Sequence, residues 1–181
     1  NLDRRTRDLI RDDTTSVLRE SGTTTLVVTH DPEDAMRIAD RIMMMRKGTV
    51  LQSGTASELY ARPNSLEVAR FFSELNEIDG ECRSASVATR LGDIEAPGMV
   101  DGPVVVCIRP KGVHLTGRRI GEVTGTVTAT QSLGDQVVVY VTVEGLERPL
   151  RTTLPITDAP AVGRIIGVAL NPEEVLIFPR G

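Results

Sequence analysis

His30 is the residue in this sequence whose type and position best suit chemistry on a phosphate group. It follows residues 23–29, a β-branched and apolar run typical of a strand covered on both faces. In open α/β sheets, ligands bind beyond the carboxyl ends of the strands, so His30 is expected beside a ligand. An imidazole there can donate a hydrogen bond to a terminal phosphate and sense its presence. For a histidine considered without its context, a structural or merely exposed role is the alternative.

Three carboxylates follow His30 closely, at Asp31, Glu33 and Asp34. Such a cluster can be imagined as a metal site. However, Asp31 before Pro32 is a typical helix N-cap, and carboxylates in a first helical turn are favoured by the helix dipole. The sequence therefore predicts capping here, and no metal ion.

The other candidate side chains favour structural roles. Methionines 43–45 are expected in the core, since methionine packs well, rather than on a soft-metal surface. Cys82, Cys107 and His114 could ligate a metal only if folding gathered them, because they share no local ligand spacing. Residues 118–119, both arginine, are interpreted as a solvated loop rather than an anion contact.

The composition excludes several classes of protein. The 181 residues are 40% hydrophobic and 25% charged, with a net charge of −4, and no apolar stretch approaches the roughly 20 residues of a membrane helix. Scattered Lys and Arg and few aromatics predict no nucleic-acid binding. Two distant cysteines indicate a reducing compartment. The chain has no recognisable leader and begins without Met, so we expect a fragment.

Two architectures follow one another along the chain. Residues 1–75 predict a helix ending near Gly22, the strand 23–29, a helix from Pro32, a hairpin over 43–52 and helices over 57–61 and 66–75, which is typical of the closing part of an α/β domain. Residues 76–181 predict a small β-barrel or sandwich. Its expected strands are 104–109, 113–116, 122–131, 136–143, 150–154, 164–169 and 175–178.

Residues 25–35, with 39–42, 47–48, 52–55 and 58–60, closely resemble the end of an ABC transporter ATPase. The resemblance implies that His30 is the switch histidine that contacts the γ-phosphate of ATP. It also implies that Asp3 belongs to the D-loop at the dimer interface. Residues 1–75 are then the C-terminal piece of a P-loop ATPase domain with an α/β fold.

Residues 106–113 resemble the segment Ile-Arg-Pro-Glu-x-Val of the TOBE domain of importer ATPases, with Lys111 in place of the usual acid. Residues 121–135 and 176–179 are also similar to that domain. The resemblance implies that residues 76–181 form an all-β, oligonucleotide-binding-like (OB-like) small barrel.

Several ATPase motifs do not occur in these residues. Neither lysine, Lys47 nor Lys111, lies in a GxxxxGK phosphate loop, and there is no Leu-Ser-Gly-Gly-Gln signature or Walker B strand. ATP and Mg²⁺ are therefore expected in the parent subunit and not on this fragment, which should be inactive as an ATPase alone.

The resemblance implies an ABC importer subunit that couples ATP binding and hydrolysis to solute uptake. Its expected partners are a second copy of itself and transmembrane permease subunits, at the cytoplasmic face of the cell membrane and without direct insertion. Residues 69–76 look most like ferric-iron importers, with polyamine and sugar importers close behind. The alternative is a non-catalytic regulatory or dimerisation module, favoured by the large β region.

Overall fold

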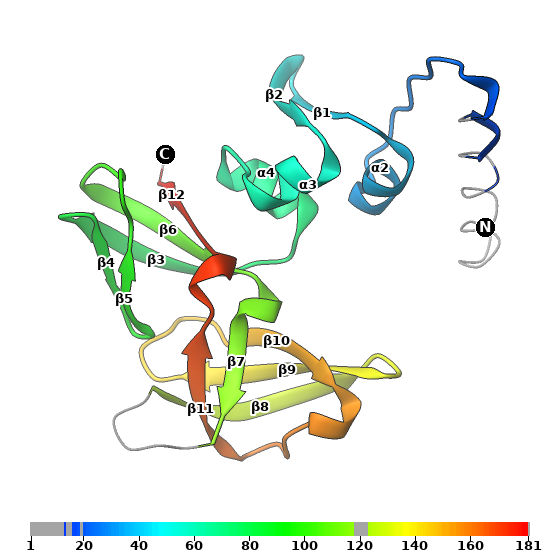
Figure 1. Cartoon of the computed structure of the whole chain (residues 1–181). Coiled ribbons are helices and arrows are strands. Elements are labelled where there is room, and N and C mark those ends of the chain that lie inside the picture. Colours follow the sequence, from blue (N-terminus) through cyan, green and yellow to red (C-terminus); the bar gives the residue numbers. More distant parts are fainter. Residues whose placement is uncertain (1–12, 14–15, 19, 118–122, 181) are drawn as a thin grey trace. The chain divides into compact units, whose positions relative to one another are not determined.

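The computed structural model describes residues 13, 16–18, 20–117 and 123–180 of the chain (Figure 1). The described residues divide into two compact units, the first ending at Ser73 and the second beginning at Glu74. Asp3 and the two arginines at 118–119 lie outside the described residues. No helix in the described ranges is long and apolar enough to cross a bilayer.

The first unit begins with helical residues at 13, 16–18 and 20–21, which end at Gly22 as the sequence predicts. Gly22 has a φ of 62°, a left-handed conformation that glycine adopts without strain. The strand predicted over residues 23–29 is wrong for this structure, where these residues form neither helix nor strand. The prediction of burial fails too, since Leu26 and Val28 are each 90% exposed. These residues have a high strand propensity. However, no described strand pairs with them, and a strand becomes buried only when it pairs with others in a covered sheet.

Helix α2 (Pro32–Ile38) is followed by a hairpin of β1 (Ile42–Arg46) and β2 (Thr49–Gly54). The tight turn between the strands has positive φ angles at Lys47 and Gly48, of 48° and 78°. Two central residues with positive φ are what a two-residue hairpin turn requires. The predicted strand, turn and strand are therefore confirmed.

Helices α3 (Ala56–Ala61) and α4 (Leu66–Phe72) close the first unit. Thr55 and Glu58 form a capping box at the start of α3, with Glu58 N donating to Thr55 Oγ1 at 3.2 Å and Thr55 N to Glu58 Oε2 at 2.8 Å. Both helices were expected, although α4 ends at Phe72 rather than at residue 75. The core of this unit consists of four buried side chains, Ile42, Leu59, Val68 and Phe72.

The expected burial of methionines 43–45 is only partly correct. Met44 packs against the core of the first unit, whereas Met43 and Met45 are 60% and 57% exposed. Successive side chains of a strand point to opposite faces, and the helices cover only one face of this hairpin in the described residues. The other face of β1 is therefore apolar and open to solvent.

The second unit contains two five-stranded antiparallel sheets, visible as separate groups of strands in Figure 1. One has the order β10-β9-β8-β11-β7 and the other β12-β6-β3-β4-β5. The strands of the first are β7 (Val113–Thr116), β8 (Thr124–Ser132), β9 (Gln136–Val143), β10 (Leu150–Pro155) and β11 (Ile165–Leu170). Those of the second are β3 (Asn76–Arg83), β4 (Ser86–Thr89), β5 (Gly92–Glu95), β6 (Gly102–Ile108) and β12 (Val175–Pro179).

One hydrophobic core is shared by both sheets. Val104, Val106 and Ile108 of β6 contribute from one sheet, and alternate residues of β9 from the other. The β9 side chains are Val137, Val139, Val141 and Val143, as the alternation in the sequence predicts. The expectation of an all-β region is confirmed, and the described chain is mostly β with few helices.

All seven strands predicted in this unit are present, with ends shifted by a few residues at most. Strands β3, β4 and β5 were not predicted. Short 3-10 helices connect some strands: η1 (Pro110–Gly112), η2 (Ile156–Asp158) and η3 (Pro172–Glu174). In the described residues no strand pairing joins β10 to β7, but the Thr152 hydroxyl on β10 donates a hydrogen bond to Val113 O on β7 at 2.8 Å.

Candidate functional site

His30 lies in the turn between the exposed run 23–29 and helix α2, and it is itself exposed. The backbone on its C-terminal side is held by a hydrogen bond from Asp31 N to Thr29 Oγ1, at 3.0 Å. This bond joins the residues on either side of His30, so it restrains the backbone that carries the imidazole. No hydrogen bond from the His30 side chain to another described residue is found, which leaves the ring accessible to a ligand.

Asp31 is the N-cap of α2, as predicted. Its Oδ1 accepts hydrogen bonds from Glu33 N at 2.8 Å and from Asp34 N at 3.4 Å. Pro32 occupies the first helical turn, where its missing N–H costs nothing. Glu33 also pairs with Arg37 at 2.9 Å, one turn along the helix. Asp31 and Glu33 thus have structural partners.

Helix α2 is attached to the first unit by one face. Ala35, Met36 and Ala39 pack against the core formed by β1 and helices α3 and α4. The position of His30 within this unit is therefore set by the Asp31 cap and by apolar packing one turn further along the chain.

The other candidates for metal binding are not brought together. Cys82 and Cys107 are buried and form no disulfide, and the pairing of β3 with β6 sets Cys82 opposite Gly102 but Cys107 opposite Glu77. His114 is exposed on β7. The described residues contain no group of three or more His, Cys, Asp or Glu side chains placed to hold a metal ion.

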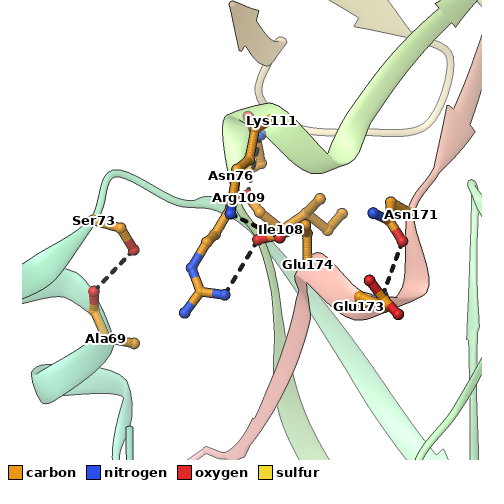
Figure 2. A network of polar contacts seen from close by, with 9 residues as sticks. All are labelled: Ala69, Ser73, Asn76, Ile108, Arg109, Lys111, Asn171, Glu173 and Glu174. Carbon is orange, nitrogen blue, oxygen red and sulfur yellow. Dashed lines mark hydrogen bonds and ion pairs between the residues drawn. The ribbon is translucent and has the colours of Figure 1, made fainter. Parts of the chain in front are cut away.

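A partly buried charge network lies at the junction of η1 and η3 in the second unit (Figure 2). The Arg109 side chain is only 5% exposed, and its Nη1 lies 3.3 Å from Glu174 Oε2. Lys111 Nζ lies 2.8 Å from the other oxygen of the same carboxylate. Burial by itself raises the pKa of the Glu174 carboxyl, but the hydrogen bonds and charges of Lys111 and Arg109 outweigh burial and hold that pKa below its ordinary value.

Backbone contacts reinforce the same junction. Arg109 N donates to Glu174 O at 3.1 Å, and Asn171 N donates to Gly112 O at 2.9 Å. A Cβ at Gly112 would collide with the Glu174 side chain, so only glycine fits there without a shift. The lysine that replaces the expected acid at position 111 therefore has a defined partner. Glu174 was not singled out in the sequence, because its partners lie more than 60 residues away.

Asn76 is another buried polar residue that sequence reasoning missed. Its Nδ2 donates to Ile108 O at 3.2 Å and to Arg151 O at 2.9 Å, and its Oδ1 accepts from Arg151 N. Ile108 belongs to β6 and Arg151 to β10, so one side chain connects the two sheets. Glu74 adds an ion pair with the Arg151 guanidinium.

Comparison with known proteins finds sequence similarity over nearly the whole chain. Residues 106–178 match the family model described as the TOBE domain. An Fe(3+) ions import ATP-binding protein of Streptomyces avermitilis is 33% identical over 98% of this chain and 51% of its own length. The chain is homologous to the ATP-binding subunits of ABC importers.

Other ABC importer ATP-binding subunits show the same relation. A spermidine/putrescine import ATP-binding protein of Borreliella afzelii is 29% identical over 99% of this chain and 52% of its own length. A glucose import ATP-binding protein of Saccharolobus solfataricus is 38% identical over 64% of this chain and 33% of its own length. The chain thus spans about half or less of the length of these importer subunits.

A solved structure of the cytoplasmic molybdate-binding protein ModG, with molybdate bound, also matches. It has a TM-score of 0.46 and 13% identity, over 58% of this chain and 96% of its own length.

Proposed function

We propose that this chain is the C-terminal part of the ATP-binding subunit of an ABC importer, in which ATP binding and hydrolysis drive solute uptake. Residues 1–75 would be the end of the ATPase domain, with an α/β fold, and residues 76–181 a TOBE-type β domain. The sheet that contains β8 and β9 would be its OB-like part. The homology over 98% of the chain supports this assignment.

The observation that carries the proposal is the exposed apolar surface of the first unit. Leu26 and Val28 are each 90% exposed, and Met43 and Met45 are more than half exposed. Apolar side chains exposed to this extent in an apolar run favour a contact with further protein. The relatives are about twice as long as the part they share with this chain. We infer that residues 23–29 pair with strands of the remaining ATPase domain.

Pairing of residues 23–29 would place His30 just beyond the carboxyl end of a strand. From there its imidazole can donate a hydrogen bond to the γ-phosphate of ATP and lose that bond when the phosphate leaves. The Thr29 hydroxyl and the Asp31 cap hold the backbone on which the ring is mounted. The role of Asp3 in the D-loop, at the interface with a second copy, is proposed from the resemblance of the sequence.

We propose that the residues that bind the rest of the nucleotide belong to further protein. No phosphate loop occurs in it, and the described residues gather no ligand set for Mg²⁺. No step through Mg²⁺ is assigned to this chain's own residues, and the chain alone is proposed to be inactive as an ATPase. The contribution of this chain is to hold the phosphate-sensing imidazole.

The proposed assembly is a dimer of ATP-binding subunits attached to transmembrane permease subunits at the cytoplasmic face of the cell membrane. Ferric iron is the first solute to test, because similar proteins from two Streptomyces species are named for Fe(3+) import. No residue described here is proposed to contact the solute, which the partner subunits would select.

Determination of the reading frame upstream of Asn1 tests the proposal. We expect an in-frame sequence that encodes a GxxxxGK loop, then a signature motif and an acid-ended strand. A start codon shortly before Asn1, with no phosphate loop in the same frame, would refute the assignment to an ATPase subunit. In that case the function of the protein would have to be carried by the β domain.

A further inference from the structure

The N-cap residue of helix α2 is bonded to the residue that precedes His30. Asp31 N donates a hydrogen bond to Thr29 Oγ1 at 3.0 Å, so this bond joins the two neighbours of His30. Asp31 Oδ1 in turn accepts a hydrogen bond from Glu33 N at 2.8 Å. Two consecutive bonds between a side chain and the backbone therefore connect the chain before His30 to the first turn of the helix after it.

Helix α3 shows a different way to bond the amide of an N-cap residue. There Thr55 N donates to Glu58 Oε2 at 2.8 Å, and the carboxylate belongs to the helix itself. In α2 the equivalent amide of Asp31 donates to a hydroxyl that lies before the helix. The capping box of α3 holds the helix end alone, whereas the Thr29 bond also restrains His30, which lies between its two partners.

Thr29 differs from the other residues of its run in burial and in what its hydroxyl contacts. Residues 23–28 are exposed, but Thr29 and Asp31 are each half-buried. A partly buried hydrogen bond competes less with water than an exposed one. The Thr25 hydroxyl donates to Thr23 O at 3.2 Å, within the exposed run and away from the turn. Of these two threonines, only Thr29 restrains the turn that leads into α2.

We propose that Thr29 is a positioning residue for the imidazole of His30, and that its hydroxyl acts through the Asp31 amide. The inference rests on the proposed function, in which His30 donates a hydrogen bond to the γ-phosphate. The ring is carried by the His30 Cα, so the backbone angles of residues 29–31 determine which positions it reaches. Thr29 itself does not touch the nucleotide in this account.

The accuracy that the proposed contact requires gives the Thr29 bond its importance. A hydrogen bond to a phosphate oxygen needs the donor within about 3 Å of the acceptor, and misplacement by about 1 Å can cost about 100-fold in rate. A donor that is already in place needs no reorganisation when charge develops. No side-chain hydrogen bond holds the His30 ring among the described residues, so its position depends on the backbone that the Thr29 hydroxyl restrains.

Hydrogen exchange on the whole chain tests the bond itself. T29V keeps the β-branched shape of the side chain and removes the hydroxyl, whereas T29S keeps the hydroxyl. We expect the Asp31 amide to exchange about fivefold faster in T29V, because it loses its acceptor. T29S and the matched control T25V should exchange at this amide as the native chain does. Unchanged exchange in T29V would overturn the proposal.

The ATPase kinetics of the complete subunit test the positioning role. T29V should lower kcat about tenfold and leave the KM for ATP nearly unchanged, because other residues would bind most of the nucleotide. T29S should restore kcat to within about twofold of the native value, and T25V should keep the native kcat. A native kcat in T29V, or a T29S subunit as slow as T29V, would contradict the inference.

A double substitution separates positioning from a merely structural role. If Thr29 acts through the imidazole, T29V should change the rate of an H30A subunit by less than about twofold. A tenfold fall in both backgrounds would show a structural role and overturn the inference. An H30A rate within a few-fold of the native rate would refute the phosphate-sensing role and this inference together. A low H30A rate with a native T29V rate would refute the inference alone.

Discussion

The Oδ1 atom of Asn76 accepts a hydrogen bond from Arg151 N at 2.6 Å, across 75 residues of sequence. Together with the two bonds donated by its amide nitrogen, this contact joins β3 and β6 of one sheet to β10 of the other. Asn76 is only 8% exposed, so water cannot replace these bonds easily. These contacts lie in the β unit, which contains the residues that match the TOBE domain model.

Replacement of Asn76 by Ala should lower the free energy of unfolding of the β unit by about 3 kcal/mol, because it leaves buried backbone groups without partners. Chemical denaturation followed by circular dichroism measures this change. The control is N171A, which removes only a cap of a short 3-10 helix and should cost about 1 kcal/mol. Equal losses of unfolding free energy in the two variants would show that the Asn76 side chain does not stabilise the contact between the two sheets.

Glu174 should make the β unit sensitive to acid. A carboxyl whose pKa is lowered in the folded state contributes stability above its unfolded pKa, and this contribution is lost as the pH falls through the folded pKa. The relevant window therefore lies below the ordinary value of 4.5. We expect E174Q to be less stable than the native chain at pH 7, by about 2 kcal/mol, because Arg109 loses a buried partner.

Below pH 4 this difference between E174Q and the native chain should shrink, because protonation of Glu174 removes the negative charge that E174Q also lacks. Thermal unfolding at a series of pH values measures it. K111M, which removes the more exposed of the two partners, should give a smaller loss at pH 7. A difference between E174Q and the native chain that stays constant from pH 7 to pH 3 would contradict the assignment.

The Asp31 cap should stabilise the turn that carries His30. D31A should increase hydrogen exchange at the Glu33 amide about fivefold, which corresponds to the loss of about 1 kcal/mol for an N-cap. D31N keeps the capping oxygen and should exchange as the native chain does. Faster exchange in both variants would mean that the charge of Asp31, and not its hydrogen bond, holds the turn.

Much of the β unit could be predicted because the alternation of apolar and polar residues along a strand reflects which of its faces is buried. Alternating valines in residues 137–143 gave strand β9 with its buried face, and Gly134 marked the turn before it. Strands β3 to β5 carry many polar residues and only a few buried side chains, so their pattern has little apolar alternation. The roles of Asn76 and Glu174 depend on partners far away in sequence, which no local pattern contains.

In the first unit, a local pattern predicted a buried strand that the structure does not contain. Residues 23–29 have the composition of a buried strand, but the described structure offers them no neighbouring strand, and they are exposed. The Asp31 cap was predicted correctly because a cap is a local interaction over three residues. The role of His30 depends on a nucleotide and on further protein, so it comes from the resemblance and not from the geometry alone.

The central claim is that His30 senses the γ-phosphate, and the most direct measurement is the ATPase rate of the complete subunit with H30A. The account predicts a rate at least about 100-fold below that of the native subunit, the scale of one lost electrostatic or proton-handling group. The matched control is H114A, since His114 is the other histidine and is exposed on β7. H114A should keep the native rate. An H30A subunit that hydrolyses ATP within a few-fold of the native rate would contradict the account.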